Sequence, residues 1–113
     1  MIVVDSSAIV AVLAGEHDAK EIEAVLEAEQ RIVLSAASKL EIMMVLGGKY
    51  ERSGIQAAQE LLFRFDIEIR PVTEDLADLA AEAFLRFGKG RHKASLNFGD
   101  CMAYALAHSA REP

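Results

Sequence analysis

Three carboxylates interrupt apolar stretches of this sequence, and they are the side chains best suited to carry chemistry. Asp5 ends the apolar run 1–4, Glu41 lies inside an apolar helical segment, and Asp100 opens another. Close carboxylates repel one another by up to about 4 kcal/mol per pair at an effective dielectric near 20. Such a cluster must therefore take up protons or hold a cation. Because every ligand is an oxygen, the expected cation is Mg²⁺ or Mn²⁺.

Each of these acids also has a purely structural interpretation, which the sequence leaves open. Asp5 can cap the helix that follows it, a role that aspartate commonly fills. Asn97 can cap the last helix, with Asp100 as a first-turn acid favoured by the helix dipole. Glu41 can pair with a nearby lysine or occupy the polar edge of its helix.

Strand and helix patterns alternate along the chain, and they predict the elements that position the acids. Short apolar or alternating runs predict strands at 1–4, 31–34 and 67–72, the last nearer an edge. Helical spacing predicts helices over 7–14, 18–28, 55–65 and 73–87, one from Ser35 or Ser38 to about Arg52, and a last one from Asn97 to about Ala110. This order favours a three-layer α/β domain with a parallel sheet, in which Gly54 separates two helices. The carboxyl ends of such strands form the usual ligand crevice, and Asp5 follows one of them.

A short basic segment precedes Asp100. Arg86, Lys89, Arg91 and Lys93 provide four of the chain's 12 basic residues, although the net charge is −6. The segment predicts a local patch that contacts phosphates beside the acids. The alternative is a solvated loop after a helix C-terminus, where cations are favoured in any case.

Bulk composition limits the class of protein. A length of 113 residues and a hydrophobic content of 52% predict one domain over 1–113 with one buried core. The single cysteine, Cys101, excludes a disulfide framework and reads as a small core residue. No signal peptide or membrane span is expected, because charges interrupt every apolar run early. We therefore expect a cytoplasmic protein.

Four segments together resemble a known family. They are 3–11, 35–38 with Glu41, 88–92 and 96–101, the last of which reads Leu-Asn-Phe-Gly-Asp-Cys. In order and spacing they resemble PIN-domain ribonucleases, and most of all the VapC-type toxins of bacterial toxin–antitoxin pairs. The resemblance covers nearly the whole chain, and the stretch 89–104 is its most specific part.

The resemblance implies a function and a set of site residues. The protein would be a Mg²⁺- or Mn²⁺-dependent endoribonuclease that acts as a toxin, with RNA and an antitoxin as partners. Asp5, Glu41 and Asp100 would be catalytic metal ligands, Ser7 would support the first acid, and Asn97 would lie beside the site. Contacts to RNA are expected from Lys89, Arg91 and Lys93.

The resemblance also implies a departure from the family pattern. VapC-like chains usually continue past the last helix into a short strand and a loop with another acid, whereas this sequence ends at Pro113. A domain without that last strand would leave 1–4 as an exposed apolar edge. The alternative function is therefore a catalytically impaired PIN-like module that binds an antitoxin.

A homodimer is expected from the amount of apolar helix surface. VapC-like proteins form two-fold dimers, and two helices here carry more apolar residues than one face can bury. The residues concerned are Ile42, Met43, Val45, Leu46, Leu61, Leu62, Phe63 and Phe65. The alternative is that these faces pack against each other within one chain.

Overall fold

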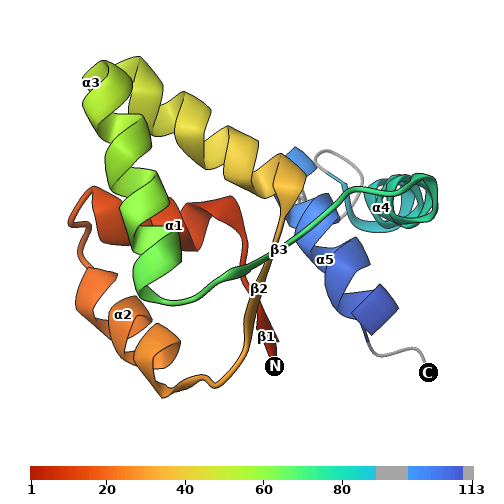
Figure 1. Ribbon diagram of the computed structural model, residues 1–113. Helices are drawn as coiled ribbons and strands as arrows, with labels where there is room; N and C mark the ends of the chain where they lie inside the picture. Colours follow the sequence, from red (N-terminus) through yellow and green to blue (C-terminus); the bar gives the residue numbers. More distant parts are fainter. Residues whose placement is uncertain (89–96, 111–113) are drawn as a thin grey trace.

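The computed structural model describes residues 1–88 and 97–110, which alternate between strands and helices (Figure 1). A short parallel sheet forms the centre, and helices lie on both of its sides. The elements are β1 (Ile2–Val3), α1 (Ser6–Leu13), α2 (Ala19–Ala28), β2 (Ile32–Ser35), α3 (Ala36–Arg64), β3 (Glu68–Arg70), α4 (Glu74–Phe87) and α5 (Phe98–Ala110).

The described sheet has the order β1-β2-β3, and both pairs are parallel. Ile2 pairs with Ile32, and Leu34 pairs with Ile69. The second strand is buried at all of its positions, as its apolar sequence predicts for the middle of a parallel sheet. All three carboxyl ends therefore lie at one edge of the sheet, which is where Asp5 and the start of α3 follow.

Two apolar clusters on opposite faces of the sheet give the fold its three layers. One lies between the sheet and α1, α2 and α3, with Ile9, Leu34 and Ile42 fully buried. The other lies between the sheet and α4 and α5, with Ala105 and Leu106 at its centre. The predicted three-layer α/β fold is confirmed. Within residues 1–88 and 97–110, no helix is both long and apolar enough to cross a membrane.

The strands are shorter than the sequence patterns predict. The first covers two residues of the expected four, and Ile2 and Val3 are half-buried where full burial was expected. Backbone pairing does extend beyond its ends, since the Ile2 N–H donates to the Arg31 carbonyl and the Val4 N–H donates to the Val33 carbonyl, both at 2.9 Å. In the described sheet this strand lies at an edge, as does β3.

The long helix α3 bends at Glu51, so the two predicted helices are present as two arms, but the break lies at Glu51 and not at Gly54. Glu51 has φ 55° and ψ −136°, which divides α3 into two arms. Gly54 keeps helical backbone and is buried against the first arm. A Cβ at Gly54 would lie 2.2 Å from the Leu46 carbonyl oxygen. Glycine is therefore needed here for close packing across the bend, and its backbone flexibility is not used.

The helix starts follow the caps that the sequence suggests. Ser35 Oγ accepts a hydrogen bond from the Ser38 N–H at 3.1 Å, and Thr73 Oγ1 accepts one from the Leu76 N–H at 3.2 Å. Each bond satisfies a backbone donor that has no partner within its own helix.

Part of the apolar surface expected to form a dimer is buried inside one chain. Ile42, Leu46, Leu61 and Leu62 belong to the core cluster beneath α3. They pack against the other arm of α3, against α1 or against the sheet, so they are not free for a partner. Of the residues expected in the dimer surface, Val45 and Phe63 are exposed. Other exposed apolar side chains were not in that set, and they include Leu40, Met44, Tyr50, Phe84, Leu85 and Phe98.

An ion-pair network on β3 predicts a pH effect on stability. A hydrogen bond from Arg70, and then one from Arg31 at 3.2 Å, lower the pKa of Glu68 below its ordinary value. A depressed folded-state pKa stabilises the protein above the unfolded pKa, and this contribution is lost as pH falls through the folded value. Urea unfolding of Glu68→Gln should therefore show a deficit at pH 7 that shrinks below pH of about 4. Glu82→Gln, an exposed control without a described ion pair, should show no such trend, and a pH-independent deficit would contradict the assignment.

Candidate active site

Asp5 lies at the carboxyl end of the first strand, where it caps α1. One carboxylate oxygen, Oδ1, accepts from the Ala8 N–H at 3.1 Å and from Ser7 Oγ at 2.7 Å. The capping interpretation and the predicted contact from Ser7 are therefore both observed. These bonds orient the carboxylate but use only Oδ1, and the side chain is partly exposed. Asp5 can thus cap its helix and still present its second oxygen to a ligand.

Glu41 lies in the second turn of α3, and it faces the start of α1. Its Oε1 accepts a hydrogen bond from Ser6 Oγ, 35 positions away in the sequence. Among the described residues Glu41 forms no ion pair, so pairing with Lys39 or Lys49 is not what holds it. Ser6 was not among the residues singled out from the sequence. The available signal was its place directly after Asp5, but nothing local indicates which acid it would contact.

Asn97 and Asp100 form a reciprocal cap at the start of α5. Asn97 Oδ1 accepts from the Asp100 N–H at 2.9 Å, and Asp100 Oδ2 accepts from the Asn97 N–H at 3.1 Å. This arrangement satisfies two backbone donors at once. It also fixes the Asp100 carboxylate at the positive end of the helix dipole, where a negative charge is favoured.

Gly99 brings the three segments together. A Cβ at this position would lie 2.7 Å from Glu41 Oε1 and 3.2 Å from Ser6 Oγ. A side chain at this position would therefore displace the Glu41 carboxylate from its present place, and glycine leaves it undisturbed. Asp5 precedes Ser6 and Asp100 follows Gly99, so the three segments that carry the acids meet here. Sequence reasoning missed Gly99, whose only signal was its position between Asn97 and Asp100.

Within the part of the chain that the structure describes, the three acids have no oppositely charged partner. In the ranges 1–88 and 97–110, Asp5, Glu41 and Asp100 make no ion pair, and their partners are hydroxyl and amide groups. In those ranges no three acid, histidine or cysteine side chains are close enough to enclose a metal ion. The donor set is nevertheless oxygen only, which is the chemistry that Mg²⁺ and Mn²⁺ prefer.

Cys101, next to Asp100, is a core residue, as its apolar setting predicts. It is 5% exposed. Burial, and then the negative charge of Asp100, raise the pKa of its thiol above the ordinary value. The thiol therefore stays protonated at neutral pH and is a poor nucleophile or metal ligand. The predicted RNA contacts, Lys89, Arg91 and Lys93, lie outside the described residues.

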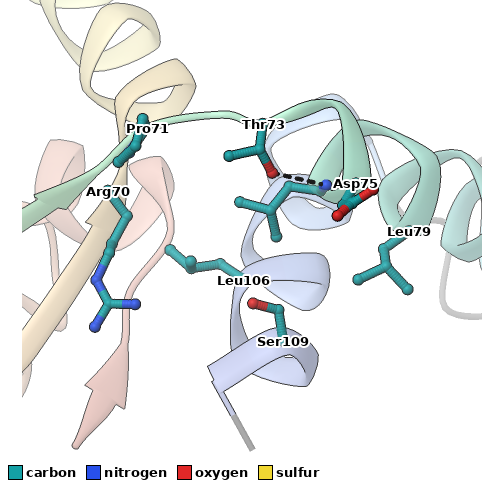
Figure 2. A pocket seen from close by; sticks show the side chains of 8 residues that line it. Arg70, Pro71, Thr73, Asp75, Leu79, Leu106 and Ser109 are labelled. Carbon is teal, nitrogen blue, oxygen red and sulfur yellow. Dashed lines mark hydrogen bonds between the residues drawn. The ribbon is translucent and has the colours of Figure 1, made fainter. Parts of the chain in front are cut away.

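Figure 2 shows a separate hollow of about 470 Å³ between the β3–α4 connection and the end of α5. Its lining includes Arg70, Leu106 and Ser109. Leu106 and Ser109 follow Asp100 by six and nine positions, which is about 9 and 14 Å along a helix. The Arg70 guanidinium is already engaged by a carboxylate of its own strand. This hollow is therefore distinct from the acidic site and lacks its chemistry.

Comparison with known proteins gives the class that this fold and site define. Residues 2–113 match the PIN domain. VapC ribonuclease Mb0640 of Mycobacterium bovis is 40% identical over 111 residues, which cover 98% of this chain and 85% of the relative. The chain therefore belongs to the PIN-domain family, and the curated relatives that it matches are VapC ribonucleases. Ribonuclease VapC28 of Mycobacterium tuberculosis is 45% identical over 113 residues, which cover 98% of this chain and 84% of that one.

A solved structure has the same fold at low sequence identity. The crystal structure of VapC20 from Mycobacterium tuberculosis, described as a Sarcin-Ricin loop cleaving toxin, matches with a TM-score of 0.76 at 19% identity. The match covers 97% of this chain and 83% of VapC20. It confirms the predicted PIN-like architecture.

Proposed function

We propose that this protein is a metal-dependent endoribonuclease and the toxin of a toxin–antitoxin pair. The observation that supports the proposal is the contact among three distant segments at Gly99, Ser6 and Glu41, since Asp5 and Asp100 are the direct neighbours of Ser6 and Gly99. The similarity to VapC ribonucleases over 98% of the chain supports RNA as the substrate. We propose the cytoplasm as its location and one domain over 1–113.

The three carboxylates would hold Mg²⁺ or Mn²⁺. A bound ion of this kind supplies an activated water for in-line attack on a phosphodiester and stabilises the charge that develops. The protein's part is orientation: Ser7 holds Asp5, Ser6 holds Glu41, and the cap with Asn97 holds Asp100. Such outer hydrogen bonds fix ligand direction and raise ligand basicity.

RNA binding requires positive charge near the site, because the net charge of the protein is −6. A phosphate backbone is repelled by uncompensated carboxylates and attracted by bound cations and basic side chains. We propose that Lys89, Arg91 and Lys93 contact the RNA backbone beside the acids.

An antitoxin protein and a second copy of the chain are the proposed protein partners. The VapC20 match is named as a toxin, which supports an inhibitor that is made alongside this protein. The exposed apolar side chains of the first arm of α3, Leu40, Met44 and Val45, support a homodimer. The rival function is a module that binds an antitoxin without cleaving RNA.

Cleavage of single-stranded RNA by the purified protein tests the enzymatic proposal. We expect cleavage with Mg²⁺ or Mn²⁺, complete loss with a chelator, and saturable Mn²⁺ binding in calorimetry. Glu41→Gln should weaken Mn²⁺ binding by at least about 100-fold, because one charged ligand is lost. Glu60→Gln, an exposed change on the other arm of the same helix, is the control. Absence of both metal binding and cleavage would favour the binding module.

A further inference from the structure

A row of polar and aromatic side chains follows the outer face of α5, and it begins at the acidic site. Asp100, Tyr104 and His108 succeed one another at intervals of four residues, which places them on one face of the helix. Tyr104 lies one turn, or about 6 Å along the axis, beyond Asp100. Helical side chains lean towards the N-terminal end of their helix, which favours a Tyr104 ring directed towards Asp100.

Two neighbouring rings hold Tyr104 in place. Its ring centroid lies 6.0 Å from that of Phe87, at the end of α4, and 6.2 Å from that of His108. The interplanar angles are 52° and 80°, so neither neighbour is stacked parallel on the tyrosine. Tilted and edge-on pairs of this kind are favourable arrangements of aromatic rings. Tyr104 is nevertheless 41% exposed, so its neighbours orient the ring while part of its surface faces solvent.

We propose that Tyr104 is a stacking platform for an unpaired nucleobase next to the phosphodiester at the acids. The inference rests on the proposed ribonuclease function and extends it to one contact of the substrate. Unpaired bases of single-stranded RNA commonly stack on aromatic side chains, and such stacking tolerates many sequences. A ring one turn from Asp100 is close enough to contact a base that flanks a phosphate bound there.

The surroundings of Tyr104 favour RNA over a second protein chain. Arg86, one residue before Phe87 in the last turn of α4, is exposed and makes no ion pair among the described residues. An exposed aromatic ring with a cation on the neighbouring helix is the combination that surfaces for single-stranded RNA use. The apolar surface proposed for the second copy lies on the first arm of α3, and it shares no residue with this face of α5.

The first test measures affinity for a single-stranded oligoribonucleotide, together with KM and kcat for its cleavage. Tyr104→Leu removes the π face, so we expect binding about tenfold weaker and a KM raised by a similar factor, with kcat little changed. Tyr104→Phe keeps the ring and should bind like wild type. Tyr50→Leu is the matched control, because Tyr50 is the chain's other tyrosine and is 56% exposed on α3.

Tyrosine fluorescence reports on the ring without removing it. The sequence has two tyrosines and no tryptophan, so in Tyr50→Phe the tyrosine emission comes from Tyr104 alone. A stacked base should quench this emission as RNA binds. In Tyr104→Phe, where Tyr50 is the remaining source, RNA should leave the emission unchanged. Removal of the base at one position beside the cut should abolish the quenching and make wild type and Tyr104→Leu bind equally.

The platform is refuted if Tyr104→Leu binds RNA like wild type, or if RNA binds to Tyr50→Phe without quenching. It is also refuted if Tyr104→Phe loses as much affinity as Tyr104→Leu, since the hydroxyl would then make the contact. Loss of self-association of Tyr104→Leu in light scattering, with unchanged RNA affinity, would assign the ring to a second copy instead. RNA binding that depends on Tyr104 without any cleavage would overturn the proposed function and leave the platform standing.

Discussion

Asp5→Asn is expected to lower RNA cleavage by at least about 100-fold while the protein stays folded. Loss of a group that only hydrogen-bonds a metal ligand already lowers metal affinity or activity by about 10- to 100-fold. Removal of a charged ligand should therefore lower activity by at least the upper end of that range. Asparagine caps helices as well as aspartate does, so the hydrogen bond to the Ala8 N–H can persist. The substitution therefore removes the charge and leaves the start of α1 in place.

Asp18→Asn is the matched control for this prediction. Asp18 occupies the corresponding position before α2 but makes no side-chain cap bond there. We expect this variant to cleave RNA at the wild-type rate, with both proteins showing the wild-type melting temperature. Cleavage by Asp5→Asn at more than a tenth of the wild-type rate would remove Asp5 from the proposed ligand set.

Gly54→Ala is expected to destabilise the fold by about 2–3 kcal/mol, or roughly 10 °C in melting temperature. The new methyl group would lie 2.2 Å from the Leu46 carbonyl oxygen and 3.1 Å from the Tyr50 Cβ. The first of these atoms is backbone and cannot turn away, so the two arms of α3 must separate. The loss should exceed the gain of about 1 kcal/mol that alanine normally brings to a helix.

Gly48→Ala, in the same helix, is expected to stabilise the fold. A Cβ at Gly48 meets nothing within 4 Å, so only the helical preference of alanine remains. We expect a stability increase of up to about 1 kcal/mol, measured by urea unfolding. If Gly54→Ala proved as stable as Gly48→Ala, the close packing across the bend at Glu51 would be disproved.

The order of the elements, the helix starts and the identity of the acids could be predicted from the sequence, because local interactions determine them. Asp5, Ser35, Thr73 and Asn97 each cap a helix through a bond to a residue three positions later. An apolar run such as 32–34 has only one favourable place, inside a sheet. The four segments that carry the family resemblance are also local patterns, and the PIN-domain match agrees with them.

The arrangement of the site was decided by tertiary packing. Ser6 contacts Glu41 across 35 positions, and no local pattern specifies such a pair. Likewise, the role of Gly54 follows from the bend at Glu51, since glycine serves a flexible hinge and a close contact equally well. Long-range contacts depend on which faces the whole core buries, so only the folded chain shows that Gly99 brings α5 against Glu41 and leaves Phe98 exposed beside it.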